Sequence, residues 1–265
     1  MTTTTRRTVL AGSAAVAAGA LLGAPAAQAR GRGAHGPKPT VVLVHGAFAD
    51  ASGWNDVAGR LIRDGYPVLA PANPLRGVAA DSAYLASILA TVSGPVVLAA
   101  HSYGGIVITN AATGNPAVKA LVYVAAFAPA RDETLVGMQS RFPGSQLSEA
   151  ALEFRPYPEG VDAYIRQEVF HDVFAGDLRR STTELMWAAQ RPADVRALQE
   201  PSAPPGWATI PSWYLVARDD KVIPPAAQRF MARRAGAQVR EVGASHVAMI
   251  SQPAATFDLI KRAAA

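Results

Sequence analysis

The stretch PVVLAAHSYGGIVITN, residues 95–110, decides the fold. Its first five residues, 95–99, form a short apolar run rich in valine, which is typical of a buried strand. Residues 104–112 contain no turn signal, and their apolar character predicts a buried helix. Ser102 therefore lies on a sharp turn between a strand and a helix, where a serine hydroxyl points out of the sheet.

The turn around Ser102 has features that a nucleophilic serine needs. Ala100 and Gly104 are small residues two positions before and after the serine, and they relieve crowding where the backbone turns. The N-terminus of the following helix offers free N–H groups and positive potential to a developing oxyanion. Because five-residue serine motifs also arise by chance, an ordinary strand-to-helix turn is the alternative interpretation of this motif alone.

Apolar runs and helix-like patterns alternate on both sides of this turn. Five further strands are expected at residues 40–44, 66–70, 118–125, 210–217 and 238–242. Helices are expected at residues 53–63, with Ser52 as the cap, and at 78–92, 224–235 and 247–262. This alternation predicts an α/β fold with a mostly parallel sheet of about six strands, flanked by helices on both faces.

The alternation stops between residues 128 and 205. This region has more charge, several prolines and many aromatic residues, and residues 182–190 have a helical pattern. We interpret residues 128–205 as a helical cap, inserted after the fourth strand and lying over the C-terminal edge of the sheet.

Residues 1–29 have the pattern of an export signal. The pair Arg6-Arg7 precedes an apolar, alanine-rich run that ends in the A-x-A cleavage pattern at residues 27–29. Paired arginines and modest hydrophobicity are typical of a twin-arginine signal. We expect a secreted protein with a flexible linker at residues 30–39 and no stable membrane insertion after cleavage; an uncleaved membrane anchor is the alternative.

Composition excludes several classes of site. The chain has no cysteine, which excludes disulfides, thiolate metal sites and cysteine nucleophiles. The formal net charge is +5, but no basic stripe alternates with aromatic residues, so we expect no nucleic-acid partner. The five histidines are dispersed without an H-x-x-x-H pair, and no glycine loop suits a nucleotide. We therefore expect neither a metal nor a cofactor.

A nucleophilic serine needs a base, and the base needs a carboxylate to orient it. His246 follows a late strand and a loop of small residues and begins a helix, at the sheet edge where ligands bind in such folds. Asp219 and Asp220 follow the strand at residues 210–217, in a loop at the same edge. Asp132, after the preceding strand, is an alternative carboxylate.

Three motifs occur in order along the chain. They are HGAF at residues 45–48, AHSYGG at 100–105, and DDKVIPP at 219–225 followed by ASH at 244–246. Together they resemble the alpha/beta hydrolases, and within them the small serine esterases related to plant methylesterases and hydroxynitrile lyases. The resemblance covers residues 40–265. Ala100 replaces the first glycine of the G-x-S-x-G motif that carries the nucleophile in that family. We also expect no strands before residue 40, so the sheet is shorter than the longest version in that family.

The resemblance implies a catalytic triad. Ser102 would be the nucleophile, His246 the base, and Asp220 the acid, because D-x-x-I-P resembles the acid loop of these enzymes. The implied reaction is hydrolysis of a small-molecule carboxylic ester through an acyl-enzyme, without a cofactor.

The resemblance also implies an oxyanion hole and a pocket. The oxyanion donors would be the backbone N–H of Tyr103 and that of Ala47 or Phe48. Aromatic residues of the cap region would line the pocket beside the loop residue Phe48, and Trp187 is the cap residue that we name. Caps of this kind can pair, so the protein is expected to be a monomer or a homodimer.

Proteins with this fold can also have other functions. Hydroxynitrile lyases typically have a lysine directly after the catalytic histidine, where this chain has Val247. They also use a threonine where the first strand leads into its loop, and this chain has valine and His45 there. A ligand receptor, a cofactor-free oxygenase or a perhydrolase is compatible with the fold. Haloalkane dehalogenases and epoxide hydrolases carry an aspartate at the position of Ser102, which disfavours both.

Overall fold

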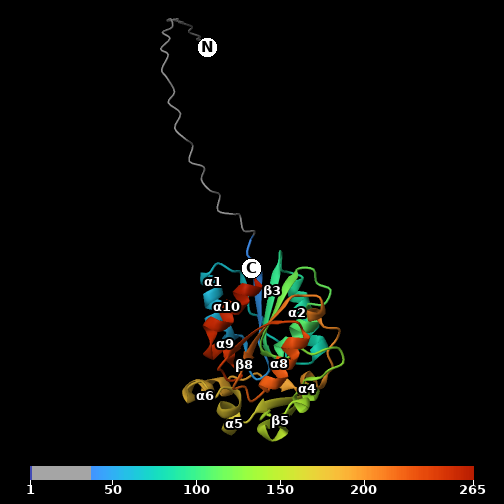
Figure 1. Ribbon diagram of the computed structural model, residues 1–265, viewed down its shortest axis with the longest axis vertical. Coiled ribbons are helices and arrows are strands. Elements are labelled where there is room, and N and C mark those ends of the chain that lie inside the picture. Colours follow the sequence, from blue (N-terminus) through green and yellow to red (C-terminus); the bar gives the residue numbers. More distant parts are fainter. Residues whose placement is uncertain (2–36) are drawn as a thin grey trace. The chain divides into compact units, whose positions relative to one another are not determined.

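Six parallel strands form the centre of the molecule (Figure 1). They are β1 (Thr40–Val44), β2 (Val68–Leu69), β3 (Val96–Ser102), β4 (Val118–Ala126), β8 (Ser212–Ala217) and β9 (Gln238–Val242). Their order is β2-β1-β3-β4-β8-β9, and every pairing is parallel, which confirms the predicted sheet. The computed structural model describes Met1 and residues 37–265, so the predicted export signal lies outside the described residues.

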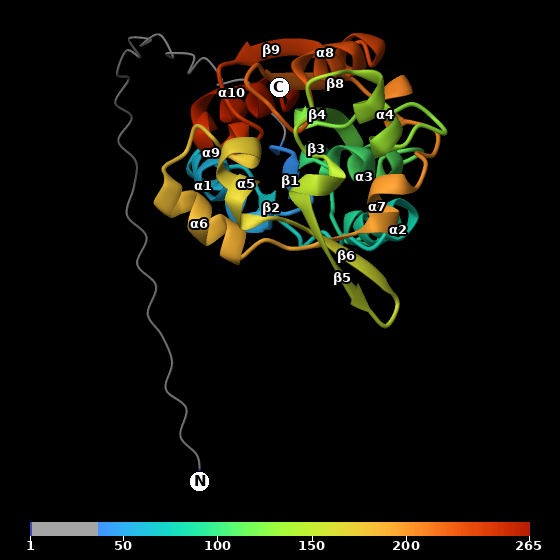
Figure 2. The same cartoon turned by 90° about the horizontal axis from the view of Figure 1, so that it is seen from below.

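Helices cover both faces of the sheet (Figure 2). One face carries α1 (Asn55–Arg63), α9 (Ala248–Ser251) and α10 (Pro253–Ala263). The other carries α2 (Val78–Leu89), α3 (Gly104–Ala111) and α8 (Pro225–Arg234). Because both faces are covered, the central strands must be apolar on both sides, and all seven residues of β3 are buried.

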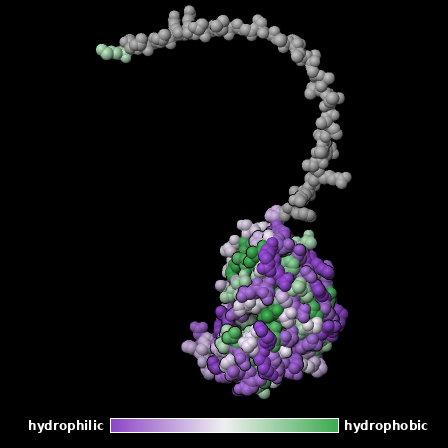
Figure 3. Space-filling model, turned by 90° about the vertical axis from the view of Figure 1, so that its left-hand side faces the viewer, coloured by the Kyte–Doolittle hydropathy of each residue, from purple (hydrophilic) through white to green (hydrophobic). Residues whose placement is uncertain are grey.

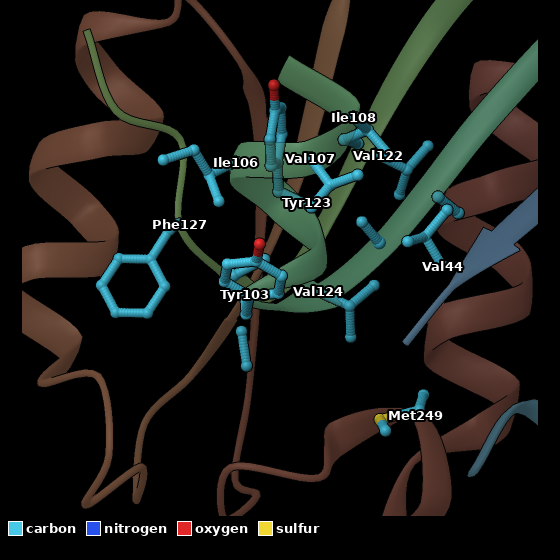
Figure 4. Close-up of a cluster of buried hydrophobic side chains, with 14 of the residues drawn as sticks. Val44, Tyr103, Ile106, Val107, Ile108, Val122, Tyr123, Val124, Phe127 and Met249 are labelled. Carbon is cyan, nitrogen blue, oxygen red and sulfur yellow. The ribbon is translucent and has the colours of Figure 1, made fainter. Parts of the chain in front are cut away.

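Helix α3 packs directly on the strands that flank it. Ile106 lies on the side of this helix that faces Phe127, and Ile108 lies on the side of Val122 in β4 (Figure 4). All three aliphatic side chains are fully buried, and each contributes roughly 1.5–3 kcal/mol by leaving water. This packing fixes the start of α3, and therefore the turn that carries Ser102.

Several element boundaries differ from the sequence-based expectations. Strand β2 has two residues, because the edge of the sheet offers it only one partner. A 3-10 turn, η1 (Ala51–Trp54), precedes α1, and its cap is Asp50, whose side chain accepts a hydrogen bond from the Ser52 N–H. The expected helix at residues 247–262 divides into α9 and α10 at Pro253, since proline has no N–H to continue the helical hydrogen bonds.

Residues 128–205 lie at the C-terminal ends of the strands, at the lower end of the view in Figure 1. This cap contains the helices α4 (Leu135–Arg141), α5 (Gln167–Phe174), α6 (Arg180–Ala188) and α7 (Val195–Gln199), with the short η2 (Glu149–Ala151). It also contains a small antiparallel sheet of β5 (Leu152–Tyr157), β6 (Gly160–Ile165) and β7 (Ala193–Asp194). The cap therefore mixes helices with a hairpin. A last short turn, η3 (Gly206–Ala208), leads into β8.

The surface is mainly hydrophilic on the side shown in Figure 3, with small separate hydrophobic patches. Residues 37–265 form one compact unit. Within the described part of the chain, no helix is both long and apolar enough to span a bilayer.

Candidate active site

The turn from β3 to α3 holds Ser102 in a strained backbone conformation. The φ angle of Ser102 is 52°, in the left-handed region that non-glycine residues rarely adopt. Neighbouring glycines allow the close approach of the backbone. A Cβ on Gly46 would lie 2.6 Å from the Ser102 Cβ, and one on Gly105 would collide with the Phe127 carbonyl oxygen. Larger residues at these two positions would displace the serine.

Ser102, His246 and Asp220 form a continuous hydrogen-bonded series. The Ser102 Oγ lies 2.8 Å from the His246 Nε2, and the His246 Nδ1 lies 2.8 Å from an oxygen of the Asp220 carboxylate. All three residues are buried; Ser102 is the last residue of β3, and Asp220 and His246 follow β8 and β9 at the same edge of the sheet. In the tautomer that suits both contacts, Nδ1–H donates to the carboxylate and Nε2 accepts from the serine hydroxyl.

Four donors hold the Asp220 carboxylate. Its Oδ1 accepts hydrogen bonds from the backbone N–H groups of Val222 (2.7 Å) and Ile223 (2.9 Å). Its Oδ2 accepts from the Gln228 side-chain amide at 2.8 Å, in addition to His246. The sequence predicts the helix that carries Gln228, but no motif points to this residue, because its contact with Asp220 depends on how α8 packs in the folded chain.

The alternative carboxylates lie elsewhere. Asp219 is exposed beside Asp220, and its backbone N–H donates to the Ala244 carbonyl. Asp132 is also exposed, and its backbone N–H donates to the Ser202 carbonyl. Of the three candidate acids, the structure brings only Asp220 to His246.

The hydrogen bonding of the backbone N–H groups near Ser102 distinguishes between the candidate donors to an oxyanion. The Phe48 N–H donates to the Arg191 carbonyl oxygen at 3.0 Å and is therefore engaged. Within the described residues, no acceptor engages the N–H of Ala47 or of Tyr103, and both residues line the pocket at Ser102. The geometry thus favours the pair Ala47 and Tyr103 over a pair that includes Phe48.

A buried pair, not expected from the sequence, anchors Tyr103. The Tyr103 hydroxyl donates to the Asp81 carboxylate at 2.6 Å, and the Arg76 N–H donates to its other oxygen at 3.1 Å. Burial raises the pKa of the Asp81 carboxyl, and burial beside Asp81 raises the pKa of the Tyr103 hydroxyl. The contact fixes the residue whose N–H faces the pocket.

Two further histidines lie beside the site. The His101 Nε2–H donates to the His246 carbonyl oxygen at 2.9 Å, and burial, with the nearby His246, holds the pKa of His101 well below its usual value. The His45 Nε2 accepts from the Asn73 N–H at 2.9 Å, and burial lowers the pKa of His45. Both rings are therefore neutral supports for the loops, and neither contacts the Ser102 hydroxyl.

The cap holds the loop that carries His246. Asp177, between α5 and α6, accepts hydrogen bonds from both the N–H (2.9 Å) and the hydroxyl (2.5 Å) of Ser245. Ser245 immediately precedes His246, so the position of the imidazole depends on a contact with the cap.

A pocket of about 670 Å³ opens at Ser102. Ala47, Phe48, Tyr103 and Phe127 line its base, and residues of α4, β5, β6 and α7 form its outer walls. The sequence-based expectation that Trp187 lines this pocket is wrong: Trp187 is not among the lining residues, and its indole N–H donates to the Ile165 carbonyl. Across the described residues, no group of three or more histidine or acidic side chains is placed to hold a metal ion.

Comparison with known proteins identifies similar sequences. A sequence model described as "Alpha/beta hydrolase family" matches residues 41–259. The chain is 29% identical to a pyrethroid hydrolase from Sphingobium wenxiniae, in an alignment that covers 80% of this chain and 83% of that protein. It is 26% identical to the alpha/beta hydrolase nvfD from Aspergillus novofumigatus, over 86% of this chain and 97% of the fungal protein.

Solved structures show the same fold. The crystal structure of polyneuridine aldehyde esterase superposes with a TM-score of 0.73 at 20% identity, covering 85% of this chain and 98% of that one. At this identity the likeness establishes the shared fold and leaves the substrate open.

Proposed function

This chain belongs to the alpha/beta hydrolase family, and we propose that it is a serine esterase that cleaves carboxylic esters through an acyl-enzyme. The observation that carries the proposal is the series of 2.8 Å contacts from the Ser102 hydroxyl through His246 to Asp220. The pyrethroid hydrolase among its relatives, which is named as a hydrolase, supports hydrolysis as the class of reaction.

The proposed reaction has two halves. Ser102 Oγ attacks the ester carbonyl while His246 Nε2 takes the hydroxyl proton, and His246 then returns that proton to the departing alcohol. Water, deprotonated by His246, attacks the acyl-serine, and the carboxylic acid leaves as Ser102 regains its proton. Asp220 keeps the Nδ1 proton in place and stabilises the imidazolium that forms in each half.

The backbone supplies the remaining stabilisation. As the carbonyl oxygen becomes an oxyanion, the N–H groups of Ala47 and Tyr103 would bind it at the base of the pocket. Loss of one such donor typically lowers turnover ~10²–10³-fold. The Asp81 contact to the Tyr103 side chain supports this assignment, because it restrains the backbone that carries one donor.

Paired substitutions of adjacent aspartates test the proposal. Asp220→Asn keeps the shape of the side chain but removes the charge that orients His246, so we expect ester turnover to fall by at least ~10²-fold. Asp219→Asn, in the same loop, alters an exposed side chain and should leave turnover within about twofold of the wild type.

Hydrolysis of short p-nitrophenyl esters, followed by absorbance, measures both variants. Equal losses in the two variants, or no loss in Asp220→Asn while the protein remains folded, would contradict the assignment of the acid.

A further inference from the structure

Phe48 lies between two pockets. It lines the pocket at Ser102, of about 670 Å³, and it also lines a second pocket of about 240 Å³. It is the single residue that the two described linings share. The two pockets therefore meet at this residue.

We propose that Phe48 is the wall that limits the size of the ester, and that the second pocket is a latent subsite for a bulky, uncharged apolar arm. This inference rests on the proposed esterase function, because it assigns the specificity of the same site. Ala47, the preceding residue, faces the reacting carbonyl in that proposal, so the wall stands directly beside the chemistry.

Backbone restraint and burial together hold Phe48 in place. Its φ angle is 60°, a left-handed conformation that costs roughly 1–3 kcal/mol for a non-glycine residue and persists only where the surroundings impose it. The Phe48 N–H bond to the Arg191 carbonyl is one such restraint, and the side chain is only 3% exposed. Phe48 is thus a fixed partition.

The second pocket lies behind the segment that carries His246. Val247 and Met249, which follow His246, form one wall, and Met186 and Ala189, in and just after the cap helix α6, form another. These residues are apolar and suit an aromatic or branched aliphatic group.

Charge restricts the ligand further. The acidic residues Asp50 and Asp56 line this second pocket, and its described lining includes no lysine or arginine. A carboxylate on the entering arm would meet like charges without a compensating cation. An uncharged arm avoids that repulsion.

Removal of the Phe48 ring should join the two pockets. An arm too large for the pocket at Ser102 could then extend into the space beside Met186. Filling that space from the other side, with Met186→Trp, should close the subsite again.

The test compares selectivity rather than activity. For the wild type, Phe48→Ala and the double variant Phe48→Ala/Met186→Trp, kcat/KM is measured for small and bulky aryl esters, with the bulk placed on the acyl side in one series and on the alcohol side in another. We expect the bulky-to-small ratio to rise about 10-fold or more in Phe48→Ala in one of the series. The double variant should return the ratio toward the wild-type value. Phe48→Leu, a smaller change of volume, should give an intermediate ratio and serves if Phe48→Ala does not fold.

Labelling of Ser102 separates this inference from the proposed function. Fluorophosphonates with a small or a bulky arm form a P–O bond to Ser102 and release fluoride, so their labelling ratio is measured by mass spectrometry without any ester turnover. A shifted labelling ratio in Phe48→Ala, with no ester hydrolysed by the wild type, would overturn the esterase proposal and keep the wall. Unchanged ratios in folded Phe48→Ala or Phe48→Leu would overturn the wall, and failure of Ser102 to react with either probe would contradict both.

Discussion

At the scale of single residues, the site depends on the hydrogen bonds that a buried carboxylate accepts. Asp220 is 4% exposed, and a buried charge is costly unless hydrogen bonds replace the lost water. Its two oxygens accept from two backbone N–H groups, the Gln228 amide and His246. These donors give the imidazolium of His246 a fixed counter-charge during each half of the proposed reaction.

The buried His101 predicts how the free energy of unfolding depends on pH. The folded state holds the pKa of His101 well below 6.5, whereas the unfolded chain restores the ordinary value, so below that pH the unfolded state binds the extra proton. Stability contributed by the neutral ring is present above pH 6.5 and is lost as the pH falls. Between pH 6.5 and 5.5 we expect this residue to lower the free energy of unfolding by about 1 kcal/mol.

The variant His101→Gln isolates that contribution. Glutamine retains an N–H donor for the His246 carbonyl but does not titrate. The difference in free energy of unfolding between the variant and the wild type should therefore change by about 1 kcal/mol between pH 6.5 and 5.5. Urea unfolding at each pH measures it, and the shifted pKa values of His45 and Asp81 cancel because both proteins contain them. Parallel curves for the two proteins would contradict a neutral buried His101.

At the scale of elements, two helical glycines have opposite roles. Gly105 in α3 lies against the Phe127 backbone, with no room for a Cβ, whereas a Cβ on Gly59 in α1 would meet no atom closer than 3.4 Å. Gly59→Ala should therefore stabilise the protein by roughly 0.5–1 kcal/mol, because alanine loses less backbone entropy. Gly105→Ala should displace α3, lowering both the melting temperature and ester turnover.

Thermal unfolding of the two alanine variants, with ester turnover measured on each, checks this prediction. The same substitution in two helices controls for helix propensity. A stabilising Gly105→Ala would show that the contact between α3 and the end of β4 does not constrain the turn at Ser102.

The sequence predicted some elements better than others, for physical reasons. Strands β1 and β9 begin and end where the apolar and alternating runs do. The β5–β6 hairpin was missed because its strands are mostly only partly covered, and charged and proline residues interrupt their apolar pattern. Such strands depend on pairing with one another rather than on local periodicity.

At the scale of the whole molecule, the cap and the sheet complete the site together. Asp177 of the cap holds Ser245 beside His246, and the Arg191 carbonyl holds the Phe48 N–H. Motif order was enough to select Ser102, His246 and Asp220 for the site. It could not show that the Phe48 N–H is engaged or that the Trp187 indole bonds to the Ile165 carbonyl rather than lining the pocket, because both facts depend on how the cap folds.

The acyl-enzyme is the most direct test of the central claim that Ser102 is an ester-cleaving nucleophile. Wild type and Ser102→Ala are mixed with a p-nitrophenyl ester, quenched in acid within the first turnover, and analysed by intact mass and peptide mapping. We predict an added acyl mass on the peptide that contains Ser102 in the wild type, together with a burst of p-nitrophenol, and neither in Ser102→Ala. An acyl group on another residue, or full turnover in folded Ser102→Ala, would contradict the account.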